Sequence, residues 1–288
     1  MQNDLTLRSN ELWCEIKPEL GGCIAGLWLG DVPVLRSTRA QDLHSVRQSG
    51  SYPLVPFSNR IGHGQLQWAG TSHPLVKNFE PEAHAIHGIG WERPWEVLES
   101  SAQFAMLSFE HKADTAWPFD FDSSQVFKIS DNALEMTLSI TNQSQVSAPV
   151  GLGWHPYFAK HPGSRVAFAA TGRWEMGTDK LPTHHAAHTG LDNDCATLTV
   201  DHCFDGWNGT LRLEDSVLRT EVTSALSRIV VFTTPERDNI AIEPVSHINN
   251  ALNLMAQTSA SAESLGVVIL QPGDTYSCAM RIQVERAV

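Results

Sequence analysis

The stretch ALEMTLSIT, residues 133–141, decides the fold class of this chain. Every second residue in it is apolar: Leu134, Met136, Leu138 and Ile140 share one side. The residues between them are polar: Glu135, Thr137, Ser139 and Thr141 share the other. This alternation is typical of an antiparallel strand with one buried face and one face towards solvent.

The same pattern extends through the chain on either side of this stretch. SCAMRIQV (residues 277–284) repeats the alternation, and RIVVF (residues 228–232) is nearly continuously apolar, which predicts a strand buried on both faces. Turn-forming residues separate such runs. They lie at Leu29–Asp31, Ser130–Asn132, Trp207–Gly209 and Pro272–Asp274.

Helices are not predicted, because no segment keeps an apolar face at helical spacing over three turns. Thr258–Glu263 is at most a short helical turn, and Arg173–Cys195 is interpreted as one long irregular excursion before a strand that ends at Val200. The chain shows neither a linker nor an internal repeat. We therefore predict an all-β protein with one domain over residues 1–288.

Composition limits the partners and the compartment. A net charge of −12 without a basic cluster argues against nucleic acid or an anionic membrane surface as a partner. The first ten residues lack the apolar stretch of a secretory signal, and no run reaches transmembrane length, so a cytoplasmic location is expected. Five scattered cysteines without a CxxC pair are interpreted as buried reduced thiols.

Metal and cofactor sites have little support. His184, His185 and His188 attract attention, as do His84 and His87, but neither group lies on a predicted helix, where such spacings would converge on one ion. No nucleophile motif and no glycine-rich phosphate loop is present. We expect neither a metal nor an organic cofactor.

Two residues are candidates for acid–base chemistry. His155 lies in VGLGWHPYF (residues 150–158), where a strand-like run ends in aromatic residues and a proline. Glu243 lies near the end of a strand predicted to stop at Pro244, where a carboxylate either lines a cleft or is paired. The alternatives are a core histidine bonded to backbone and an ion pair between Glu243 and Arg237.

Other residues are suited to a carbohydrate. The donor fork of Arg60 matches a hydroxyl or a carboxylate, and Asp201 can accept bonds from two hydroxyls. Alternatively, Arg60 is a solvated turn residue and Asp201 an ordinary turn former. Four tryptophans offer flat apolar faces for a sugar ring. They are Trp91, Trp95, Trp154 and Trp207.

At these positions the sequence resembles the aldose 1-epimerase (mutarotase) family. The matching motifs occur in the order of the family and span roughly residues 55–275. They are NRIG from Asn59, IHG from Ile86, WHPYF from Trp154, DHCF from Asp201, IEP from Ile242, NNALN from Asn249 and LQPGD from Leu270.

The resemblance implies a large antiparallel β-sandwich of the galactose-mutarotase type with an open cleft. It further implies cofactor-free interconversion of α and β anomers of a hexose. In this family's pattern Glu243 corresponds to the general base, His155 to the general acid and His87 to a second histidine near the ring oxygen. The substrate-binding positions are Arg60, Asp201, Asn59 and Trp91.

Two departures from the galactose-acting members bear on the substrate. Ile89 stands where those members have a second glycine, and the form His155-Pro156-Tyr157-Phe158 resembles a branch that includes hexose-6-phosphate mutarotases. A phosphosugar needs two or more cationic groups, and Arg36, Arg39 and Arg47 are candidates to supply them. The acidic charge balance favours a neutral aldose, and phosphosugar remains the alternative.

The required starting state is an ionised Glu243 and a protonated His155, on opposite sides of the anomeric centre. A neighbouring carboxylate, Asp201 or Glu243 itself, would favour the imidazolium. The competing functions are a non-catalytic carbohydrate-binding β-sandwich and a glycoside hydrolase with Asp201 as second carboxylate. We expect a small-molecule sugar as partner and a monomer or weak homodimer.

Overall fold

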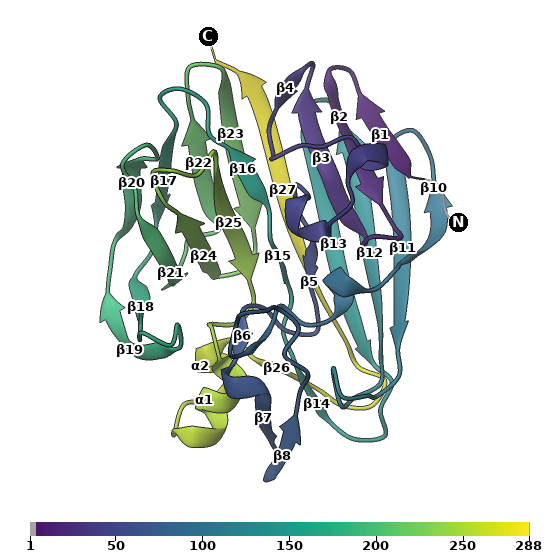
Figure 1. Cartoon of the computed structure of the whole chain (residues 1–288), viewed down its shortest axis with the longest axis vertical. Coiled ribbons are helices and arrows are strands. Elements are labelled where there is room, and N and C mark those ends of the chain that lie inside the picture. The colour runs from purple at the N-terminus through teal and green to yellow at the C-terminus, as the bar shows by residue number, and fades with distance from the viewer. Residues whose placement is uncertain (1–3, 288) are drawn as a thin grey trace.

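The computed structural model describes residues 4–287. Figure 1 shows two layers of strands that run along the longest axis of the molecule, with two short helices at one end. The predicted domain 1–288 includes residues 1–3 and 288, which lie outside the described residues, so its extent stays a prediction.

One layer is a nine-stranded antiparallel sheet built from the predicted alternating strands. In spatial order its strands are β10 (Glu96–Ser100), β11 (Phe104–His111), β12 (Phe121–Ser130), β13 (Ala133–Asn142), β27 (Thr275–Arg286), β23 (Leu218–Ser224), β22 (Thr210–Glu214), β17 (Arg165–Ala169) and β20 (Gly190–Asp194). The alternation in β13 and β27 is confirmed, because the apolar residues of both strands are buried on one face.

The other layer contains an eight-stranded sheet and a four-stranded sheet. The eight strands are β19 (Pro182–Ala187), β18 (Gly172–Met176), β21 (Val200–Asp205), β24 (Arg228–Thr233), β25 (Asn239–Val245), β15 (Gly153–Trp154) and β5 (Pro53–Leu54), with β16 (Tyr157–Ala159) also paired to β25. The four are β1 (Leu5–Ser9), β2 (Leu12–Lys17), β3 (Cys23–Leu29) and β4 (Val32–Pro33). The prediction of a large antiparallel β-sandwich with few helices is confirmed.

Smaller elements close one end of the sandwich (Figure 1). They are the strand pairs β6 (Arg60–Ile61) with β9 (Ala85–Ile86), β7 (Gln65–Trp68) with β8 (Thr71–Pro74) and β14 (Ala148–Val150) with β26 (Val268–Leu270), and the helices α1 (Ala251–Gln257) and α2 (Ala262–Leu265). Four 3₁₀ turns lie at Ala40–Asp42, Val46–Gln48, Gly62–Gly64 and Gly90–Glu92. The segment 258–263 expected to be a helical turn only partly overlaps α2, and α1 was not predicted.

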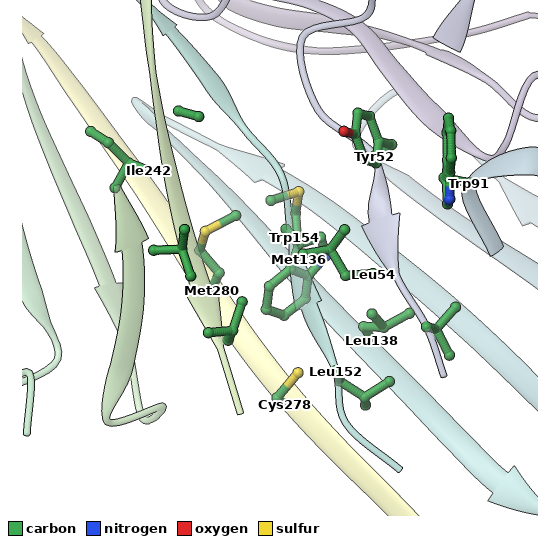
Figure 2. Packing of buried hydrophobic residues seen from close by; sticks show 14 of the residues in the cluster. Tyr52, Leu54, Trp91, Met136, Leu138, Leu152, Trp154, Ile242, Cys278 and Met280 are labelled. Carbon is green, nitrogen blue, oxygen red and sulfur yellow. The ribbon is translucent and has the colours of Figure 1, made fainter. Parts of the chain in front are cut away.

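The core lies between the two layers. Figure 2 shows Met136, Leu138 and Met280 of the nine-stranded sheet facing Ile242 and Trp154 of the opposite layer. All five are almost completely buried. The alternation that selects the strands therefore also supplies one wall of the core.

Three expectations about strands were wrong. Arg173–Cys195 is not one irregular excursion, because it contributes to β18 and forms β19 and β20. The polar faces of these edge strands are exposed, so they lack a clear apolar period. The strand that contains Asp201 begins at Val200, whereas we expected a strand to end there. In addition, β25 does not stop at Pro244 but continues to Val245, although proline has no N–H to donate to the sheet.

The cysteines have the predicted state. All five are buried and free of disulfides. Burial raises the pKa of the Cys14 and Cys23 thiols to about 12, so neither is a thiolate at neutral pH. Among residues 4–287, no helix combines the length and the apolar character needed to cross a bilayer.

We predict that Leu138→Ala lowers the free energy of unfolding by about 2–5 kcal/mol, because it opens a cavity in the core. Leu138 is completely buried on β13. Thr137→Ala, on the other face of the same strand, is the matched control and should change stability by less than about 1 kcal/mol. Urea unfolding of both variants measures the difference, and equal losses would contradict the assigned orientation of β13.

Candidate active site

The pairing of β25 with β15 and β16 places His155 opposite Glu243. Gly153 pairs with Val245, and Tyr157 pairs with Ala241. The same register brings His155 level with Glu243, although Pro156 interrupts the ladder between the two short strands. The sheet therefore brings together the two residues that the sequence offered as acid–base candidates.

Neighbouring strands add residues to the same face of the sheet. On β24, Val230 pairs with Glu243 of β25 and Phe232 pairs with Ala241 of β25. On its other side, Phe232 pairs with Asp201 of β21. Since side chains two residues apart along a strand share a face, Asp201, Val230, Phe232 and Glu243 point the same way.

This face forms the floor of a cavity of about 370 Å³, a size suited to a monosaccharide. Loops supply the walls. The lining residues are Tyr52, Asn59, Arg60, Phe79, Glu82, Ile86, His87, His155, Tyr157, Lys180, Asp201, Val230, Phe232, Arg237 and Glu243.

His155 and Glu243 are in direct contact. The His155 Nε2 atom lies 3.2 Å from the Glu243 Oε1 atom, and both side chains are almost completely buried. Burial lowers the pKa of His155 well below its ordinary 6.5, and its interactions with the neighbouring His87 ring and the Arg36 guanidinium lower it further. Burial raises the pKa of Glu243 well above its ordinary 4.5, and the nearby Asp201 carboxylate adds to this. Both directions favour an uncharged pair.

The protonation state therefore differs from the expected one. In the uncharged pair the exchangeable proton is on the carboxyl group, whereas we expected a carboxylate beside an imidazolium. The two states contain the same number of protons and differ by one transfer between Oε1 and Nε2. In addition, the Nδ1 atom of His155 and the Oε2 atom of Glu243 are buried without any hydrogen-bond partner in the described part of the chain. Hydrogen bonds from a bound molecule would satisfy both atoms.

His87 is held in one tautomer. The backbone N–H of Asn59 donates to the Nδ1 atom of His87 at 3.2 Å. Burial lowers the pKa of His87 to about 3, so the ring is neutral and its single proton resides on Nε2. The residue adopts a left-handed backbone with φ of 63°, and Gly88 follows at 70° where an added Cβ would collide with the backbone oxygen of Val55. This strained turn presents His87 as a fixed donor at the cavity wall.

Arg60 is not a solvated turn residue. It is 7% exposed and forms a two-pronged ion pair with Glu82, at 3.0 and 3.2 Å. Its third nitrogen donates to the side-chain oxygen of Asn59 at 3.2 Å. Lys180 donates to Glu82 from the β18–β19 loop at 2.7 Å. The hydrogen bond from Arg60, aided by Lys180, holds the pKa of Glu82 at about 2.

The other predicted contacts divide. Asp201 lines the cavity, whereas Trp91 does not. Trp91 lies behind Tyr52, with ring centroids 5.5 Å apart, and its indole N–H donates to the Gly88 carbonyl (Figure 2). Trp95, Trp154 and Trp207 are likewise buried and do not line the cavity. Flat apolar faces are supplied instead by Phe79 and Phe232.

The alternative for Glu243, an ion pair with Arg237, does not form, because Glu243 contacts His155. Arg237 nevertheless lines the cavity, and its buried Nε atom has no hydrogen-bond partner among residues 4–287. The upstream arginines do not line the cavity. Arg36 lies over the outer face of Tyr157, Arg47 lies over Phe79 and Arg39 pairs with Glu15.

The histidine cluster has ordinary surroundings. His184 and His185 are exposed on β19, and His188 follows that strand. Within residues 4–287, no three His, Cys, Asp or Glu side chains are arranged to hold a metal ion. His84 accepts a hydrogen bond from the His63 backbone and contacts the Asp179 carbonyl, away from His87.

Sequence reasoning missed several lining residues. Glu82, Lys180 and Tyr52 come from loops that carry no periodic signal. By contrast, Val230 and Phe232 belong to the predicted strand RIVVF, and Tyr157 belongs to the WHPYF motif. Strand registers, once known, would have identified these three.

Comparison with known proteins gives consistent results. The model of the family described as aldose 1-epimerase matches residues 4–283. The chain is 28% identical to the uncharacterized protein YphB of Escherichia coli (strain K12), over 97% of this chain and 98% of that protein. It is 27% identical to the uncharacterized protein YihR of the same strain, over 69% and 70% respectively.

Solved structures share the fold. The crystal structure of a putative aldose 1-epimerase from Escherichia coli K12 superposes with a TM-score of 0.88 at 26% identity, covering 99% of each chain. A galactose mutarotase-like protein from Clostridium acetobutylicum gives 0.84 at 21% identity, covering 99% of this chain and 95% of that one.

Proposed function

Because this chain belongs to the aldose 1-epimerase family, we propose that it interconverts the α and β anomers of a hexose by acid–base ring opening and closure. The observation that carries the proposal is the buried contact between His155 and Glu243 at the floor of a cavity of monosaccharide size. The Nδ1 and Oε2 atoms of this pair have no hydrogen-bond partner among residues 4–287, which leaves both available to a ligand.

The chemistry needs one proton acceptor and one donor near a single carbon. The two groups were expected on opposite sides of the anomeric centre, but their 3.2 Å contact places them side by side. The anomeric carbon bears both the hydroxyl and the ring oxygen, so two adjacent groups can reach both. Transfer of the shared proton from Glu243 to His155 yields a carboxylate and an imidazolium. Glu243 then takes the proton of the anomeric hydroxyl while His155 protonates the ring oxygen, and the bond between carbon and ring oxygen breaks.

The second half of the reaction reverses these transfers. The aldehyde rotates about the bond to its neighbouring carbon, and the ring hydroxyl attacks the other face of the carbonyl. His155 now takes the proton of that hydroxyl, and Glu243 returns its proton to the former carbonyl oxygen. The pair ends as it began, so no external acid or base is consumed.

Other residues orient the sugar in this proposal. His87 offers its Nε2–H as a donor to a sugar oxygen at the cavity wall. Arg60 and Asn59, which are hydrogen-bonded to each other, lie beside His87. Asp201 accepts hydrogen bonds from sugar hydroxyls. The five cysteines without a disulfide fit a reducing cytoplasm. We place the protein there as a monomer or weak homodimer.

Polarimetry of freshly dissolved α-glucose and α-galactose tests the activity. Enzyme at micromolar concentration should speed the approach to equilibrium in proportion to its amount. If the rate stays at its spontaneous value while the sugar still binds, the protein is a carbohydrate-binding module and the proposed reaction is wrong.

We expect a neutral aldose to be the better substrate, and Arg237 is the observation that favours a phosphorylated one. Arg60 and Lys180 both pair with Glu82, which leaves Arg237 as a lining cation without a carboxylate partner in the described region. Two or more such groups are usual for a phosphate. We predict that kcat/KM for glucose exceeds that for glucose 6-phosphate.

Measuring both sugars at two ionic strengths, with wild type and Arg237→Met, decides between them. A preference above about tenfold for the phosphosugar, weakened by salt and lost in Arg237→Met, would overturn the neutral-aldose proposal. Arg212→Met, at an exposed position of β22, is the matched control and should change neither ratio.

A further inference from the structure

The acid His155 has a second neighbour besides Glu243. The hydroxyl of Tyr157 lies 3.5 Å from the same Nε2 atom, and the hydroxyl of Tyr52 lies 3.3 Å from that of Tyr157. A nitrogen and two hydroxyls thus form a short chain that ends at the atom that must give and take a proton.

The two tyrosine rings also pack against the imidazole. Their centroids lie 4.4 Å and 4.8 Å from that of His155, with interplanar angles of 30° and 32°. The hydroxyls are therefore fixed relative to Nε2 by ring packing. Neither hydroxyl can move away from the imidazole without disturbing the packing of the rings.

Tyr157 is itself held in place from outside. Its backbone pairs with Ala241 of β25, two residues from Glu243. The Arg36 guanidinium lies 3.8 Å from the centroid of its ring, and three hydrogen bonds to the carbonyls of Ser49 and Arg47 hold that guanidinium. Burial raises the pKa of Tyr157, so its hydroxyl stays protonated and can donate.

The direction of the hydrogen bonds in this series can reverse with the protonation state of His155. When Nε2 is bare, Tyr157 donates to it and accepts from Tyr52. When Nε2 carries a proton, Tyr157 turns its own hydrogen towards Tyr52. Either arrangement leaves the proton count of the two tyrosines unchanged.

We propose that Tyr157, supported by Tyr52 and Arg36, is a positioning residue that stabilises the unprotonated Nε2 of His155 between the two proton transfers of each turnover. The proposal rests on the function proposed above. Other groups that face His155 are Glu243, His87 and, through its charge, Arg237. The Glu243 carboxyl also donates in its uncharged state, but its proton is the one that the reaction transfers, whereas the Tyr157 hydroxyl keeps its own proton.

Tyr157→Phe removes only the hydroxyl. Since a hydrogen bond to the neutral form lowers a histidine pKa, its loss should raise the pKa of His155. We expect kcat to fall about tenfold with KM changed less than threefold, and the acid limb of the pH profile to move upward. Tyr52→Phe should show the same changes more weakly, and Tyr276→Phe on β27, outside the cavity, should show none.

A measurement without substrate separates this proposal from the proposed function. Nitrogen-15 NMR of the His155 ring reports hydrogen bonding at Nε2 and its titration directly. A shifted Nε2 resonance and a raised pKa in Tyr157→Phe, absent in Tyr276→Phe, support the role even if no tested aldose is turned over. An unchanged resonance and pKa in Tyr157→Phe, or a change in KM alone, would overturn it.

Discussion

Glu243→Gln is expected to lower kcat for mutarotation by about 10²–10⁴-fold, the usual contribution of a general base. Glutamine keeps the size and one carbonyl oxygen of the side chain but cannot take the proton of the anomeric hydroxyl. KM should change little, because the variant preserves the shape of the cavity. Polarimetry with glucose measures the loss, and near wild-type kcat would show that another group is the base.

The pH dependence of the unfolding free energy provides a second, substrate-free test of Glu243→Gln. The raised pKa means that folded Glu243 keeps a proton that the unfolded chain releases above about pH 4.5. Wild-type stability is therefore lost as the pH rises from 4.5 towards the folded pKa. Glutamine does not titrate, so Glu243→Gln should become relatively more stable with rising pH. Urea unfolding at pH 5 and pH 8 tests this, and a variant that loses stability at pH 8 would contradict the uncharged state.

His155→Ala is expected to lower kcat by a similar factor, about 10²–10⁴-fold, because no proton donor then faces the ring oxygen. The substitution leaves a space bordered by the Tyr52 and Tyr157 rings. Added imidazole should enter that space and restore part of the activity in a saturable manner. His44→Ala, at an exposed position, is the matched control.

The pH dependence of His155 has the opposite sign from that of Glu243. Its lowered pKa means that the unfolded chain binds a proton that the folded protein refuses as the pH falls below 6.5. Wild-type stability should therefore fall below pH 6.5, and His155→Ala should reduce that fall. A pH profile of stability identical in wild type and His155→Ala would show that folding does not lower the pKa of the imidazole.

The sequence predicts the main sheet well because one physical signal dominates there. Leu138 and Thr137 differ in burial because the strand has one face towards the core. The edge strands β19 and β20 have no such contrast, since both of their faces meet solvent over much of their length. For the same reason the sequence pattern of Arg173–Cys195 predicts an irregular segment instead of strands.

The site was predictable to the extent that strands build it. His155 and Glu243 face each other because of a register that pairs Tyr157 with Ala241. Glu82 and Lys180 come from separate loops, 98 residues apart in the chain, and meet only through the tertiary fold. Glu82 also pairs with Arg60, so the role of Arg60 in binding depends on a residue 22 positions away in the chain.

Trp91 illustrates the limit of a motif. Its neighbour His87 lines the cavity, but a 3₁₀ turn carries Trp91 behind Tyr52. A sequence motif gives proximity along the chain, and the direction of each side chain depends on the turn between them.

The most direct test of the acid–base pair is the exchange rate between the α and β anomer signals of glucose at equilibrium, measured by magnetisation-transfer NMR. Wild type should raise this rate above its spontaneous value. Because His155 and Glu243 act together in the same proton transfers, the double variant His155→Ala/Glu243→Gln should be no slower than the slower single variant. A double variant that loses the product of the two single effects would contradict a coupled pair, and wild type at the spontaneous rate would contradict the reaction itself.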